Sequence, residues 1–95
     1  MNVYFFSGVA VYEELKQREL ATIDFCAKAT EDFKKYTMSE IRVDYDRKNR
    51  TANVFQNGSI IRTFDFTDNV AGFAAAEDEL SNYLERLDHE FSTMQ

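Results

Sequence analysis

The chain has 95 residues, the length of one domain, and its formal net charge is −6. Its composition, 44% apolar and 15% aromatic, excludes a disordered acidic tail. The single cysteine, Cys26, excludes an internal disulfide, and no apolar run is long enough to cross a membrane. The N-terminus also lacks the basic region of a signal peptide. We therefore expect one cytoplasmic domain over residues 1–95 with no membrane association.

The first segment, Asn2 to Tyr12, is dominated by Val, Tyr and Phe. These residue types are favoured on pleated, half-buried strands, so the segment predicts a strand.

The next segment, Glu13 to Tyr36, fits two structures. As one amphipathic helix, it collects on one side the apolar residues Tyr12, Leu15, Ile23, Cys26, Phe33 and Tyr36. Its middle, ELATIDFCAKAT, also alternates apolar and polar residues with period two, as a strand does. In that alternative, Glu13 to Arg18 forms a turn and a short helix begins near Thr30. The strong helix formers of EELKQREL favour the single helix, and the two alternatives stay open.

The middle of the chain predicts strands. IRVDYD alternates apolar and charged residues, and Asn57-Gly58 separates the apolar runs RTANVFQ and SIIRTFDF. Asn-Gly between two such runs is a strong hairpin signal, because a type I′ turn needs positive φ at both central residues. A two-residue loop would pair Phe55 with Ile60, Val54 with Ile61 and Arg50 with Asp65. Both faces of this hairpin carry apolar residues, so we expect a helix on one face and another element or a partner subunit on the other.

The last segment predicts an amphipathic helix that is capped by Thr67 or Asp68 and runs to about Phe91. Its apolar positions recur at three- and four-residue spacing and are Phe73, Ala76, Leu80, Tyr83, Leu84, Leu87 and Phe91. The fold class is therefore α+β: a single small domain in which an antiparallel sheet of four or five strands carries a C-terminal amphipathic helix on one face.

No motif predicts catalysis, a metal or a cofactor. His89, the only histidine, follows Glu85 by four residues, but a zinc site needs three or four ligands. Cys26 is expected to be a small buried hydrophobe. Asp44 and Asp46 share one strand face and point to solvent rather than across a cleft. The glycines are single, so no phosphate-binding loop is present. We expect a protein that is not an enzyme.

The central hairpin is the one basic region, and its basic residues are Arg42, Arg47, Lys48, Arg50 and Arg62. It supports one alternative function, a small nucleic-acid-binding domain. An order of helix, three strands and helix is similar in outline to double-stranded-RNA-binding domains, which hold RNA largely through phosphate contacts. Because the last helix is acidic and contains no lysine, this similarity does not carry RNA binding to the chain, and we do not expect direct nucleic-acid binding.

The acidic charge is concentrated at one end. Residues 63–90 contain eight acidic residues and one basic residue, Arg86. On a helix, Asp78 and Glu85 lie about 10 Å apart and Glu85 and Asp88 about 4.5 Å apart, intervals that could occupy a site built for phosphates. The sequence therefore predicts a protein-interaction module, an inhibitor that presents an acidic, nucleic-acid-mimicking helix face to the basic surface of a nucleic-acid-handling protein. Its partner-binding residues would be Glu77, Asp78, Glu85 and Asp88, and a homodimeric structural protein is the other alternative.

Overall fold

The computed structural model describes residues 3–94, together with the side chains of residues 12–94. The elements follow one another as α1 (Val3–Phe33), β1 (Ile41–Asp46), β2 (Thr51–Gln56), β3 (Ser59–Asp65) and α2 (Val70–Met94). The three strands form one antiparallel sheet in the order β1-β2-β3. The fold is a small α+β domain with three strands rather than the four or five predicted.

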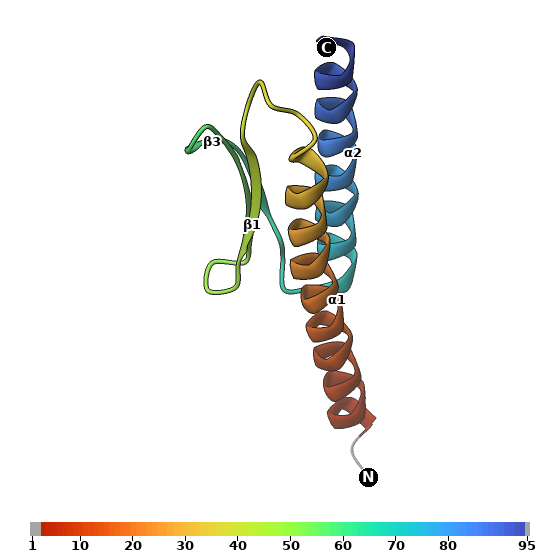
Figure 1. Ribbon diagram of the computed structural model, residues 1–95. Helices are drawn as coiled ribbons and strands as arrows, with labels where there is room; N and C mark the ends of the chain where they lie inside the picture. The colour runs from red at the N-terminus through yellow and green to blue at the C-terminus, as the bar shows by residue number, and fades with distance from the viewer. Residues whose placement is uncertain (1–2, 95) are drawn as a thin grey trace.

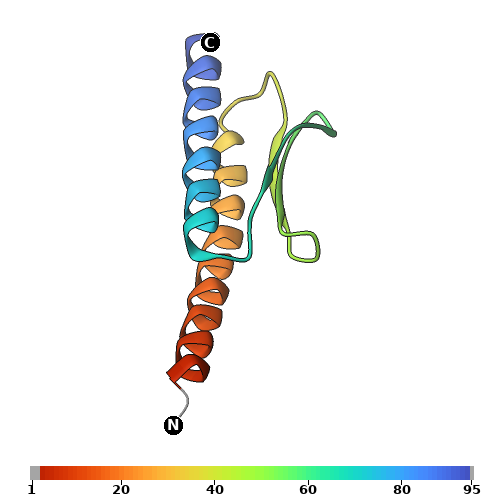
Figure 2. The ribbon, with the colours of Figure 1, turned by 180° about the vertical axis from the view of Figure 1, so that it is seen from behind.

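The two helices form one layer and the sheet forms a second layer on one side of them (Figure 1). α1 and α2 run in the same direction. The three antiparallel strands between them bring the chain back toward the end of the molecule at which α1 begins. The N-terminal turns of α1 extend beyond the start of α2 and beyond the sheet. Seen from behind, α2 and β3 lie in front of α1 and β1 (Figure 2). The molecule therefore has an α1/β1 side and an α2/β3 side.

The predicted N-terminal strand is wrong, because Val3 to Tyr12 belong to α1; Asn2 lies outside the described residues. Val, Tyr and Phe favour strands mainly through packing against neighbouring strands, and this segment lies beyond the sheet in Figure 1. Of the two alternatives for residues 13–36, the single helix is correct, and three backbone hydrogen bonds between residues three apart continue it as turns to Tyr36. The period-two pattern in the middle of this segment is incidental to the helix.

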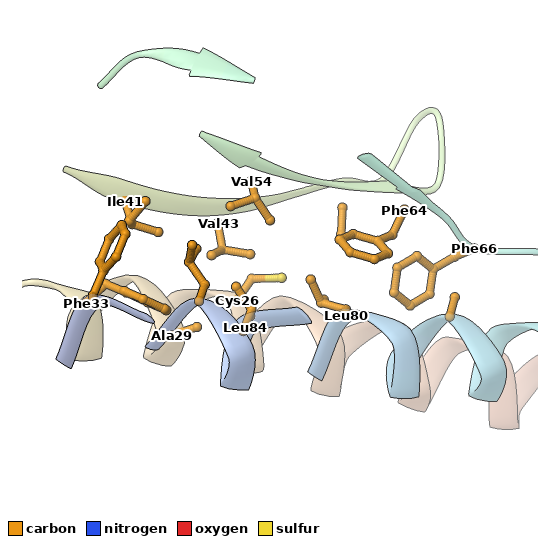
Figure 3. Packing of buried hydrophobic residues seen from close by; sticks show 14 of the residues in the cluster. Cys26, Ala29, Phe33, Ile41, Val43, Val54, Phe64, Phe66, Leu80 and Leu84 are labelled. Carbon is orange, nitrogen blue, oxygen red and sulfur yellow. The ribbon is translucent and has the colours of Figure 1, made fainter. Parts of the chain in front are cut away.

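The core lies between the two layers (Figure 3). Cys26, Ala29 and Phe33 of α1, with Leu80 and Leu84 of α2, face the inner side of the sheet. The predicted apolar stripe of α2 is confirmed, since six of its seven positions are buried and Tyr83 packs against the same cluster. From the sheet and its flanks, the core receives Ile41, Val43, Ala52, Val54, Phe64 and Phe66.

The Asn57-Gly58 hairpin is confirmed, with φ of 52° at Asn57 and 87° at Gly58. Phe55 pairs with Ile60 as predicted, but the remaining register is shifted by a β-bulge, which leaves Ile61 extra in β3. Val54 consequently pairs with Arg62 rather than Ile61. Asp65 pairs with Thr51, and Arg50 lies in the preceding turn with a positive φ.

α2 begins one or two residues later than predicted. The Asn69 side chain accepts a hydrogen bond from the Gly72 amide at 2.7 Å, so Asn69, rather than Thr67 or Asp68, caps the helix. Thr67 instead donates its hydroxyl to the Asn69 carbonyl.

Candidate protein-interaction surface

The four predicted partner-binding carboxylates lie on α2, and two of them are already bound within the protein. Glu77 is reached by Arg18 of α1, whose Nη1 atom lies 3.3 Å from each carboxylate oxygen. The hydrogen bond to Glu77 raises the pKa of Arg18. This contact joins residues 59 positions apart in the chain, and it fixes α2 against α1.

Asp88 is the second carboxylate with an internal role. Its Oδ1 atom accepts the Tyr36 hydroxyl at 2.6 Å and lies 3.1 Å from Lys35 Nζ. The hydrogen bond from Tyr36, and then that from Lys35, lower the pKa of the Asp88 carboxyl. The carboxylate therefore ties α2 to the end of α1, and its charge is partly compensated there.

Asp78 and Glu85 are different, because both are exposed. Within the part of the chain that the structure describes, neither forms an ion pair. They are seven residues apart, so they lie two turns apart on the same side of α2. These two carboxylates are available to a partner.

A groove between α1 and α2 lies beside these two carboxylates. It consists of two adjoining hollows of ≈ 300 and ≈ 380 Å³, and both are lined by Phe25 and Ser81. Asp78 lines the first hollow and Glu85 the second. No sheet residue lines either hollow, so the groove opens on the side of the helix layer away from the sheet.

Phe25 is the functional candidate that sequence reasoning missed. Its side chain is 39% exposed at the junction of the two hollows, between the two free carboxylates. The period-two pattern assigned it to a strand face and the helical pattern left it off the apolar stripe. A large aromatic residue off the stripe of an amphipathic helix is the signal that could have found it.

Cys26 is buried in the core, as expected, with 2% of its surface exposed. Burial raises the pKa of its thiol to about 11, so the thiol is protonated at neutral pH and is a poor nucleophile. Within residues 12–94, whose side chains are described, no three His, Cys, Asp or Glu side chains come together as metal ligands.

The two strand carboxylates have structural partners. Asp44 pairs with Arg42, and Asp46 accepts hydrogen bonds from the Lys48 and Asn49 amides and from the Asn49 side chain. The bonds from Asn49 lower the pKa of Asp46. Both residues therefore stabilise the sheet and its turn.

The basic hairpin is largely neutralised by internal contacts. Arg47 pairs with Glu19 at 3.0 Å, and Arg50 pairs with Asp68 at 2.7 Å. Arg42 also lies over the Phe55 ring, 4.0 Å from its centroid. Most of the positive charge predicted for this region is thus compensated, which weakens it as a phosphate-binding surface.

No protein-family model matches the chain, and no curated protein and no solved structure is significantly similar to it. The described helices include none with the length and hydrophobicity needed to cross a bilayer.

Proposed function

We propose that this protein is a non-enzymatic interaction module that binds a basic partner through the α1–α2 groove. The observation that carries the proposal is the position of exposed Phe25 between Asp78 and Glu85, two carboxylates without ion-pair partners among the described residues. An aromatic anchor at the centre and charged groups at the rim are the usual anatomy of a protein interface.

The partner is expected to present arginine or lysine side chains around an apolar residue. Phe25 would contact the apolar residue, and Asp78 and Glu85 would receive the cations. Glu77 and Asp88 would contribute indirectly, because they hold α2 in register with α1. A basic surface of a nucleic-acid-handling protein has this chemistry, so the inhibitor role fits the two free carboxylates together with the groove.

The test is affinity capture from the native cell at low and high salt with three forms of the protein. The first is unmodified, and the second carries Asp78→Asn and Glu85→Gln. The third carries Glu13→Gln and Glu40→Gln, which remove the same charge at exposed positions outside the groove. The proposal requires a protein that the first and third forms retain and the second loses.

Competition with nucleic acid tests the mimicry. Duplex DNA should displace the captured protein, because the DNA and the groove would occupy the same basic site.

Equal retention by all three forms in the capture experiment would contradict the proposal. Direct, salt-sensitive binding of DNA or RNA to this protein would instead favour the basic hairpin around Arg47, Lys48 and Arg50.

A further inference from the structure

The two edges of the sheet are treated differently. At the β1 edge, the Thr30 hydroxyl of α1 accepts a hydrogen bond from the Val43 amide at 2.9 Å. Its one proton lies between the Cys26 carbonyl of α1 at 2.9 Å and the Val43 carbonyl at 3.2 Å. This side chain satisfies the outward amide of Val43 and lies against its carbonyl, so α1 covers the β1 edge at Val43.

The β3 edge has no such cover. The Phe66 amide donates to the Arg50 carbonyl at 2.9 Å, so the backbone N–H and C=O groups of Phe66 point toward β2. Because antiparallel ladders alternate, the backbone groups of Phe64 and Arg62 also point toward β2, whereas those of Thr63 and Asp65 point away from the sheet. In the described chain no residue hydrogen-bonds to them. An uncovered strand edge of this kind is a template for another strand.

The side chains of β3 are exposed over the same stretch. Five consecutive residues, from Ser59 to Thr63, are exposed, and they include Ile60 and Ile61. Two exposed isoleucines on an open edge favour pairing with another strand. The same strand also exposes two charged residues of opposite sign, Arg62 and Asp65.

The charges along this edge favour a second copy of the chain. Tyr83 of α2 packs against Phe64 of β3, and the Arg62 guanidinium lies over both rings. Three- and four-residue spacing places Glu79, Arg86 and Glu90 on the same flank of α2 as Tyr83. With Arg62, this flank carries two positive and two negative charges, and the exposed Asp65 of β3 adds a third negative charge. The edge is therefore close to neutral although the chain carries −6, and charge repulsion between two copies is small there.

We propose that two copies of this protein associate by antiparallel pairing of their β3 edges, around a two-fold axis at Thr63. The two sheets then form one six-stranded antiparallel sheet, and Thr63 of each copy exchanges both backbone hydrogen bonds with Thr63 of the other. Arg62 lies opposite Phe64 of the second copy. The two α2 helices then run antiparallel. Glu79 and Arg86 lie on either side of Tyr83 along the helix, so the two-fold axis brings Arg86 of each copy level with Glu79 of the other. The α1–α2 groove is on the opposite flank of α2 and stays open in each copy.

Sedimentation of the full chain over a micromolar to millimolar range tests the association. The unmodified protein should sediment as a dimer. Thr63→Lys places like charges opposite each other and should raise the dimer dissociation constant by about tenfold or more. The matched variant Thr37→Lys, at an exposed threonine in the loop before β1, should leave it unchanged.

Cross-linking tests the register without relying on a destabilising variant. A hydrogen-bonded antiparallel pair places its Cα atoms about 5.5 Å apart, within the range of a disulfide. Thr63→Cys should form a covalent dimer under mild oxidation, much faster than Thr37→Cys, and buried Cys26 should not compete. The proposal is overturned if the protein is a monomer at every concentration. It is overturned as well if the β3 edge of that monomer pairs with an extended peptide of another protein instead. A dimer that Thr63→Lys does not weaken and Thr63→Cys does not trap would overturn it as well.

Discussion

Two pairs of carboxylates on α2 carry the same charge, but only one pair binds cations within the described chain. Glu77 and Asp88 bind Arg18, Lys35 and Tyr36 of α1 and its following turn, whereas Asp78 and Glu85 bind no cation among the described residues. The difference follows from their angular position on the helix. The first pair lies next to the apolar stripe and faces α1, and the second lies further round and faces solvent. An acidic helix face is thus a structural surface on one side and a candidate binding surface on the other.

The apolar stripe of α2 should contribute more to the free energy of unfolding than either pair of carboxylates. Leu84 is 5% exposed and lies one residue before Glu85. Leu84→Ala should lower the free energy of unfolding by about 2–5 kcal/mol, because it removes buried methyl groups and leaves a cavity. Urea titration measures the loss. A change below about 0.5 kcal/mol, the size usual for surface positions, would mean that α2 is not part of the core.

Asp88 should rank second in its effect on stability. Asp88→Asn removes the ion pair with Lys35 and weakens the hydrogen bond from Tyr36. The side chain is 45% exposed, so solvent screening limits the expected cost to about 1 kcal/mol. A thermal melt at neutral pH compares this variant with Asp78→Asn. If the two variants melt alike, the division between the two pairs is wrong.

The same residue should affect the pH dependence of folding. The pKa of Asp88 is lower in the folded protein than its usual value, so its stabilising contribution is present above a pH of about 4. That contribution is lost as the pH falls through the lower, folded-state pKa. Melts in acid should therefore show the gap between the unmodified protein and Asp88→Asn closing below about pH 4. Asp46, whose pKa is also lowered, leaves a residual dependence in both proteins. A gap that stays constant with pH would contradict the role given to Asp88.

The free pair should have the smallest effect on folding. Asp78→Asn and Glu85→Gln should each change the free energy of unfolding by no more than about 0.5 kcal/mol, because neither side chain has a charged partner to lose. Urea titration of the double variant checks this. A large loss of stability would show that these carboxylates are structural and would remove them as binding residues.

Local patterns in the sequence predicted much of the fold. The strand at Ile41–Asp46, the Asn57-Gly58 turn and the apolar stripe of α2 are each determined by residues close in the chain. The N-terminal helix was missed because strand propensity reflects packing against neighbouring strands, and this segment lies beyond the sheet (Figure 1). The bulge at Ile61 shifted the register by one residue, and no local pattern marked it.

The candidate site was harder to predict. The sequence identified an acidic face but could not divide it, because the division depends on contacts with α1 and its following turn, between residues 52 to 59 positions apart. Phe25 is a candidate because it lies in the groove between α1 and α2, and the packing of these two helices side by side is not visible in the sequence. In the same way, Thr30 covers the β1 edge at Val43 from 13 residues away, which no spacing in the sequence indicated.

Affinity for the captured partner at two salt concentrations, measured for the groove variant and for the matched charge control, tests the groove as a binding site most directly. We expect Asp78→Asn with Glu85→Gln to weaken binding and to reduce its salt dependence, mainly through a slower association rate. We expect Glu13→Gln with Glu40→Gln to bind like the unmodified protein. Equal affinities and equal salt slopes for the two double variants would contradict the proposal, since the groove would then contribute no more than the general negative charge.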